Sequence, residues 1–174
     1  MRKYLFLLIA FLLTAVGSMQ AQRETTSILD DKYDFKATTP EGNVLYLHEL
    51  VGKTDYVLVD FWASWCGPCR RAIRELKELY ASLPAGRLEI LSCSVDQDET
   101  KWRKALEEDQ MPWPQVFEGN NWCSGKYNVE YIPHLVLFDR NGNLIGSRMS
   151  LDEVKAKVAQ STTNKKKFTF PDKP

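Results

Sequence analysis

Short apolar runs alternate with amphipathic stretches along most of this chain. Residues 56–61 and 88–95 are mostly apolar and partly β-branched, which predicts two buried strands. After the first run, residues 70–82 place apolar side chains at helical spacing, and after the second, residues 99–109 predict another helix. Strands that alternate with helices are typical of an α/β fold.

Turn sequences between further apolar runs predict two β-hairpins. Residues 35–37 and 44–47 flank a Pro-Glu-Gly-Asn turn, and residues 135–138 and 144–148 flank Asp-Arg-Asn-Gly-Asn. The second signal is the stronger one, because Asn-Gly is a dipeptide that tight hairpin turns prefer. An antiparallel pair that follows alternating strands and helices predicts an α/β sandwich with a mixed sheet.

The remaining elements are shorter. Residues 115–131 predict a short strand, a loop and a helical turn. Residues 151–159 predict a closing amphipathic helix, because Ser150 stands at the N-cap position and Glu153 completes a capping box with it.

The N-terminus has the pattern of a secretory signal peptide over residues 1–21. Arg2 and Lys3 precede an apolar run at residues 4–16, and small and polar side chains follow at residues 17–21. A membrane-spanning helix needs about 20 apolar residues, so we expect cleavage, with an uncleaved membrane anchor as the alternative. No cysteine lies there to carry a lipid. We therefore expect an exported, periplasmic protein that is soluble once the leader is removed.

Composition and charge limit the organisation and the partners. A chain of 174 residues that is 44% hydrophobic suits one domain, expected at residues 35–160 after a lead-in at residues 22–34. Residues 161–174 predict a basic flexible tail. Since 23 basic residues balance 23 acidic ones, nucleic acid is not expected as a partner.

The candidate chemistry lies between the strand over residues 56–61 and the helix that follows it. Cys66 and Cys69 enclose Gly67 and Pro68, and two thiols at this spacing can close a disulfide and reopen it by exchange. A helix N-terminus stabilises a thiolate, which lowers the pKa of a cysteine there from about 8.5. We expect Cys66 to be the attacking thiolate and Cys69 the more buried, protonated thiol.

The other two cysteines leave several possibilities open. Cys93 lies in the strand-like run at residues 88–95, where a buried, unreactive thiol is the simplest interpretation. A structural disulfide between Cys93 and Cys123, or a regulatory thiol at Cys123, are the alternatives. No metal site is expected, because these cysteines form no second close pair in the sequence and His48 and His134 supply no metal-binding spacing.

Two segments carry a resemblance to a known family. Residues 59–69 resemble the thioredoxin active-site segment almost letter for letter, and residues 131–138 resemble its cis-proline segment. The leader, the hairpin region at residues 39–52 and an insert at residues 102–131 resemble the exported TlpA/ResA-like thioredoxins, over roughly residues 28–160. The resemblance implies a thioredoxin fold: a three-layer sandwich with a mixed central sheet, an N-terminal β-hairpin extension and an insert before the cis-proline strand.

The resemblance also implies roles for individual residues. Cys66 would be the nucleophile, Cys69 the resolving thiol, and Asp60 a buried carboxylate that accepts the proton of Cys69. Burial should raise the pKa of Asp60, whereas a merely structural, hydrogen-bonded carboxylate is the alternative. Ile132 and Pro133 would form the cis peptide bond that faces the disulfide and shapes a groove for the client backbone.

Several neighbours would complete the substrate site in such a protein. Trp65, Gly67 and Pro68 would contact the client together with the cis-proline segment. Trp62 and Trp65 could both border the sulfur atoms, or pack in the core instead. His134 could tune the Cys66 thiolate, or simply begin a strand.

The function implied is that of a thiol-disulfide oxidoreductase without a cofactor. It would reduce disulfides of exported client proteins, possible clients being the haem-attachment cysteines of cytochromes c, with electrons from a membrane-embedded donor. A peroxiredoxin-like peroxidase is one alternative, although Ala63 stands where its motif has threonine. The other is a non-enzymatic peptide-binding module around Pro133, in which Cys66 and Cys69 form a structural staple.

Overall fold

The central strand and helix of the computed structural model, which describes residues 28–160, follow the apolar pattern closely. Strand β3 spans Tyr56–Trp62 and leads into helix α2, Gly67–Ser82. Strand β4, Leu88–Ser94, leads into helix α3, Glu99–Asp109. The predicted leader and basic tail lie outside the described residues.

Both predicted hairpins are present. Strands β1, Lys36–Thr38, and β2, Val44–Tyr46, pair antiparallel, and the 3-10 helix η1, Leu47–Glu49, follows them. Strands β6, His134–Asp139, and β7, Leu144–Met149, form the second antiparallel pair.

The irregular region and the last helix also match the sequence pattern. Strand β5, Gln115–Phe117, and the short helix α4, Trp122–Lys126, make up the segment before β6. Helix α5, Leu151–Ala159, begins at a capping box in which the Ser150 hydroxyl accepts a hydrogen bond from the Glu153 backbone N–H.

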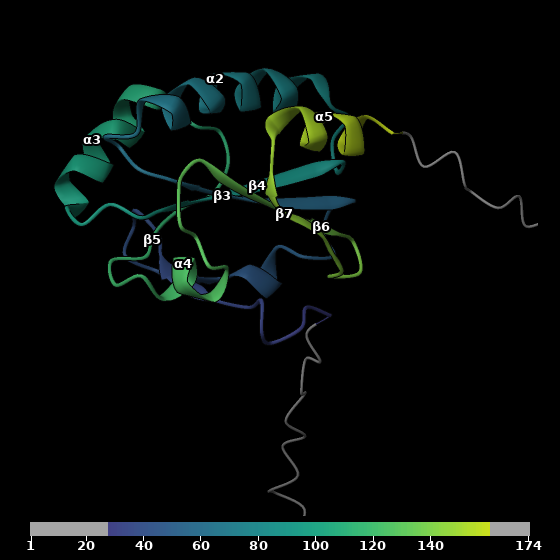
Figure 1. Ribbon diagram of the computed structural model, residues 1–174, viewed down its shortest axis with the longest axis horizontal. Helices are drawn as coiled ribbons and strands as arrows, with labels where there is room; N and C mark the ends of the chain where they lie inside the picture. The colour runs from purple at the N-terminus through teal and green to yellow at the C-terminus, as the bar shows by residue number, and fades with distance from the viewer. Residues whose placement is uncertain (1–27, 161–174) are drawn as a thin grey trace, which may run out of the picture.

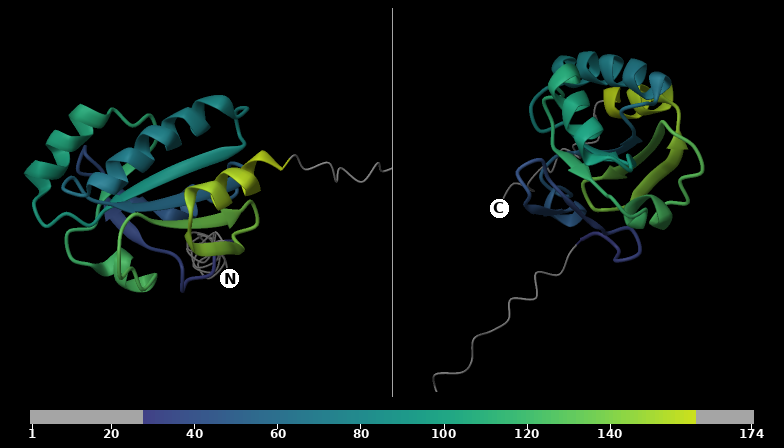
Figure 2. Two further views of the ribbon diagram at one scale, coloured as in Figure 1. Left: turned by 45° about the horizontal axis from the view of Figure 1, so that its top comes forward. Right: turned by 90° about the vertical axis from the view of Figure 1, so that its left-hand side faces the viewer.

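One mixed sheet of seven strands connects these elements, in the order β2-β1-β5-β4-β3-β6-β7 among the described residues. Strand β3 lies inside the sheet, parallel to β4 and antiparallel to β6. Helices α2, α3 and α5 cover one face, and the N-terminal segment and α4 lie on the other (Figures 1 and 2). This is the three-layer sandwich that the sequence predicts.

Alternation along β3 assigns its side chains to the two faces. Val57, Val59 and Phe61 pack in the core beneath α4, whereas Leu58 packs against α2 and α5. Since successive side chains of a strand point to opposite faces, Asp60 lies on the α2 face with Leu58. The acidic side chain therefore shares a sheet face with the helix that carries both active-site cysteines.

The lead-in is more closely integrated than a separate segment would be. Leu29 is buried, and the Tyr33 ring stacks on Tyr127 with a centroid distance of 6.2 Å. The Tyr127 hydroxyl donates a hydrogen bond to the Tyr33 carbonyl. Residues 28–34 thus complete the core beneath the sheet.

Within the described chain, none of the helices combines the length and apolar character that crossing a membrane requires.

Candidate active site

The two cysteines of the motif are joined by a disulfide at the start of helix α2. Cys66 is the N-cap residue, and its sulfur accepts a hydrogen bond of 3.1 Å from the backbone N–H of Cys69. The helix begins at Gly67, three residues before the apolar periodicity suggests, because Pro68 is tolerated in a first turn where no intrahelical N–H bond is needed.

This position distinguishes the two sulfur atoms. Cys66 is 5% exposed and Cys69 only 1%, so a client disulfide can approach Cys66 more easily. The unpaired N–H groups of the first turn and the positive end of the helix dipole favour negative charge on the Cys66 sulfur. Cys66 therefore lies where the sequence predicts the attacking cysteine to lie.

The segment before β6 faces the disulfide from the other side. The Ile132 carbonyl oxygen lies 3.9 Å from the Cys66 sulfur, and the peptide bond between Ile132 and Pro133 is cis. Because both residues precede β6, which pairs with β3, the sheet brings this segment beside the strand that leads into the motif.

Asp60 is a buried carboxyl group on the α2 face of the sheet. It is 1% exposed, and its Oδ2 accepts a hydrogen bond of 3.0 Å from the Ser92 hydroxyl. The Ser92 oxygen in turn accepts a bond of 2.9 Å from the Trp113 indole N–H. Desolvation raises the pKa of Asp60 to about 7, although the bond from Ser92 partly offsets that effect. Asp60 can therefore exchange a proton near neutral pH.

A second buried carboxylate holds the loop that precedes the motif. Asp96 accepts hydrogen bonds from the Ser64 backbone N–H, at 2.8 Å, and from the Ser64 hydroxyl, at 2.7 Å. Ser94 donates its hydroxyl to the same carboxylate. Ser64 and Asp96 follow the carboxyl ends of the neighbouring parallel strands β3 and β4. This anchor sets the position at which the chain enters α2.

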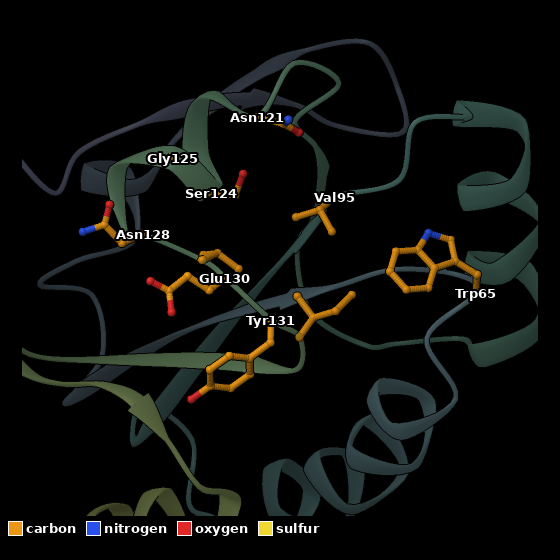
Figure 3. Close-up of a pocket in the computed structure, with 10 residues that line it drawn as sticks. Trp65, Val95, Asn121, Ser124, Gly125, Asn128, Glu130 and Tyr131 are labelled. Atoms are coloured by element: carbon orange, nitrogen blue, oxygen red, sulfur yellow. The ribbon is translucent and has the colours of Figure 1, made fainter.

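An open groove of about 630 Å³ begins beside the disulfide. Trp65, which is 68% exposed, lies at one end of it, and Glu130 and Tyr131 lie across from it (Figure 3). Val95 lies between these ends (Figure 3), and Ile132 also lines the groove. Apolar and polar groups both line the groove, so it can accept an extended peptide segment.

The fold and this geometry agree with the comparison to known families. The sequence model of a family described as thioredoxin-like matches residues 53–144, more than half of the 174-residue chain. This chain belongs to the thioredoxin-like family.

Individual relatives in this family support a narrower placement. The thiol-disulfide oxidoreductase ResA of Geobacillus kaustophilus is 28% identical over 140 residues, which cover 80% of this chain and 79% of that protein. The thioredoxin domain of a thiol-disulfide oxidoreductase from Bacteroides vulgatus has a TM-score of 0.64 at 29% identity, covering 72% and 90% of the two chains. A thiol:disulfide interchange protein from a Bacteroides species has a TM-score of 0.65 at 28% identity, covering 77% and 89%. The predicted resemblance to TlpA/ResA-like thioredoxins is confirmed.

The structure separates the predicted substrate-binding residues into two groups. Trp65 and Ile132 line the groove. Gly67 and Pro68 are exposed in the first turn of α2, and Pro133 is half-buried next to Ile132. Only the first two are therefore groove-lining residues, whereas the others define the backbone around the disulfide.

The structure decides between the alternatives that the sequence left open for Trp62 and His134, in favour of core packing for the first and the beginning of a strand for the second. Trp62, the last residue of β3, is fully buried with both cysteines against α2 and α3, and therefore cannot offer a contact surface. His134 is also fully buried and begins β6; its Nε2 lies 2.9 Å from the Ser147 hydroxyl and its ring meets Phe61 edge-on. Burial lowers the pKa of His134, and its alternation with Leu135 turns it toward the α4 face.

Sequence reasoning missed Ser92, Trp113 and Asp96, the polar partners that hold the site. A signal was available for two of them, since Ser92 and Asp96 lie near the carboxyl end of the strand that follows the motif strand. Polar side chains at that edge of neighbouring parallel strands often meet. Trp113 had no such signal, because its indole reaches Ser92 only through the packing of the loop before β5.

Proposed function

We propose that this chain reduces the disulfides of exported client proteins. The chain is a thiol-disulfide oxidoreductase of the thioredoxin fold, as its family, its relatives and the Cys66 to Cys69 disulfide show. The observation that carries the proposal is the disulfide itself, which lies at a helix N-terminus and at the end of an open groove. This placement combines a stabilised thiolate with room for a client chain.

The first step is attack on the client. The reduced Cys66 thiolate forms a bond to one sulfur of the client disulfide, that S–S bond breaks, and the second client sulfur leaves as a thiolate that takes a proton from water. A mixed disulfide between Cys66 and the client results. Trp65 and Ile132 flank the place where it forms.

The second step releases the client. Cys69 gives up its proton, its thiolate attacks the Cys66 sulfur, and the remaining client sulfur leaves and is protonated. Two electrons have then passed from the enzyme dithiol to the client, and the enzyme is left with its disulfide. Asp60 is proposed to accept the Cys69 proton, directly or through water, because a carboxyl with a pKa of about 7 is both a competent base and easily reprotonated.

Partners follow from this electron balance. An enzyme that reduces clients outside the cytoplasm must itself be reduced again, so we propose a membrane-embedded electron donor. The leader pattern supports export to the periplasm. Client proteins with closely spaced cysteine pairs, including cytochromes c before haem attachment, are the proposed substrates.

Replacing Trp65 with alanine is expected to raise KM for a protein disulfide about tenfold while kcat changes little. Truncating an exposed tryptophan at the centre of a contact commonly removes about 1.4 kcal/mol or more of binding free energy, which corresponds to this factor. Steady-state reduction of insulin, coupled to a chemical reductant, measures both constants. Trp122→Ala, at an exposed tryptophan outside the groove, is the matched control and should leave KM unchanged. Equal KM values for the two variants would contradict the role of Trp65.

The reduction potential of the Cys66 to Cys69 pair tests the proposed direction. Equilibration against glutathione or dithiothreitol buffers, with thiol alkylation and mass detection, should give a reduction potential like that of thioredoxins, about −270 mV. A value near about −120 mV, typical of strong oxidants, would contradict client reduction. A cysteine pair that fails to equilibrate with these buffers would indicate a structural staple. In a separate assay, rapid turnover of hydroperoxide would indicate a peroxidase.

A further inference from the structure

Three potential metal-ligand side chains meet on the face of the sheet opposite to Asp60. Cys93 comes from β4, Glu118 follows β5, and Cys123 belongs to α4. The two sulfur atoms and a carboxylate oxygen all lie within 4.8 Å of one another. Cys93 and Cys123 are 0% and 1% exposed, and Glu118 is 9% exposed. Three elements that are separate in sequence thus direct their donor atoms to one point.

We infer that Cys93, Glu118 and Cys123 bind a thiophilic divalent cation of the zinc class. Zinc prefers thiolate, imidazole and carboxylate ligands, with Zn–S bonds of about 2.3 Å and Zn–O bonds of about 2.0–2.2 Å. Bonds of these lengths place the ligand atoms of a tetrahedral site roughly 3.5–4 Å apart. The observed cluster needs only a small contraction to reach this geometry, and none of its three residues takes part in the disulfide exchange itself.

Hydrogen bonds hold the carboxylate of this cluster in place. One Glu118 oxygen accepts a bond of 2.7 Å from the Ser124 backbone N–H, and the other accepts a bond of 2.7 Å from the Ser124 hydroxyl. Ligating carboxylates in proteins commonly have such outer partners, which orient them before the metal arrives. Because Ser124 follows Cys123 directly, the same turn of α4 supplies one ligand and orients another.

A backbone carbonyl and a surface cavity lie beside this cluster. The carbonyl oxygen of Lys36, in β1, lies 3.6 Å from the Cys123 sulfur. Lys36 and Glu118 both line an open cavity of about 280 Å³ on the surface. Glu118 is the ligand that this cavity reaches, so we expect an ion to enter past its carboxylate, and either the carbonyl or a water molecule to complete a coordination shell of four.

The charge balance of binding requires no oxidant. Each thiol loses its proton to solvent as its sulfur forms a bond to the cation, and no electron is transferred. A second disulfide between Cys93 and Cys123 is the competing possibility. A disulfide explains why the two sulfur atoms are close together. It does not explain why the Glu118 carboxylate lies beside them, since its bonds to Ser124 would then be its only role.

The sequence argued against a metal because Cys93 and Cys123 are far apart in the chain. The sheet overturns that reasoning, since β4 pairs with β5 and places Cys93 opposite Val116, two residues before Glu118. Bound metal would also tie α4 to the sheet. Ser124 and Gly125 of that helix line the client groove, so the cation would fix one wall of it.

Zinc binding can be tested on the full chain with Cys66 and Cys69 both replaced by serine, which removes the other thiols that could take metal. Titration with zinc alone, by calorimetry and native mass spectrometry after reduction, should show one ion per chain and a rise in the unfolding temperature. Cadmium should produce the thiolate-to-metal charge-transfer band in the ultraviolet, which reports sulfur ligation with Cys93 and Cys123 intact.

Variants of the ligands sharpen the test. Cys93→Ala and Cys123→Ala should abolish the charge-transfer band, and Glu118→Gln should weaken zinc binding about tenfold or more. Glu107→Gln, at an exposed position on α3, is the matched control and should bind as tightly as the parent. The proposal is overturned if the reduced parent binds no zinc. It is also overturned if Cys93 and Cys123 of the purified parent are joined in a disulfide and the protein binds no zinc in that state.

Discussion

Replacing Cys66 with serine is expected to lower the rate of client disulfide reduction by roughly 10³-fold or more, because serine cannot replace the attacking sulfur and the remaining thiol, Cys69, is only 1% exposed. Cys66 is the N-cap residue of α2 and the more accessible of the two sulfurs. The serine hydroxyl can still cap the helix, so the fold should be retained. Insulin reduction under a constant supply of dithiothreitol measures the loss.

The companion variant Cys69→Ser distinguishes the two roles. It should still attack the client and then accumulate the mixed disulfide, which is visible as a covalent adduct by mass spectrometry. Ala81→Ser, at the exposed end of the same helix, serves as the control for introducing a hydroxyl and should retain full activity. If Cys66→Ser stays active while Cys69→Ser forms no adduct, then the roles of the two cysteines are reversed.

Replacing Asp60 with asparagine is expected to stabilise the protein at pH 8 by about 4 kcal/mol, since that is the free energy equivalent of raising a carboxyl pKa from 3.8 to about 7. Above pH 7 the wild type buries an ionised carboxylate, and only well below the ordinary pKa of 3.8 is the group protonated in both the folded and unfolded states. Stability therefore falls as pH rises between these limits, and asparagine removes that dependence. Urea unfolding of the oxidised proteins at pH 4 and pH 8 measures the difference.

The pH dependence of activity gives a second measure of Asp60. If the ionised carboxylate accepts the Cys69 proton as proposed, resolution of the mixed disulfide should accelerate as pH rises through about 7. In Asp60→Asn we expect this step to be about 10²-fold slower and without that inflection. Asp31→Asn, which removes an exposed carboxylate, is the control. An inflection near pH 7 that survives in Asp60→Asn would have to belong to another group.

The elements of the fold were predictable because their signals are local. The apolar run over β3, the helical spacing in α2 and the Asn-Gly turn between β6 and β7 depend on neighbouring residues. Apolar spacing indicates α2 only from residue 70, because a cap and a proline set the helix boundary, and it was the cysteine motif that placed the start of the helix at Cys66. Asp60 was expected to be a buried acid because the family resemblance implies it, and its place within an apolar strand agrees with that.

The partners around the site could not be predicted in the same way. Trp62 and Trp65 stand three positions apart in similar sequence, and only the end of β3 determines that one is buried and the other exposed. Trp113 reaches Ser92 through a loop whose path depends on the packing around it.

The sequence by itself determined the order of strands and helices, the redox motif at a strand-to-helix turn and the family, because all of these depend on residues close together in the chain. Tertiary structure alone decided that Ile132 approaches Cys66, that Ser92 meets Asp60, and that Cys93, Glu118 and Cys123 converge. Those contacts join segments that only sheet pairing brings together. Their distances are set by register and packing, which no local pattern of residues encodes.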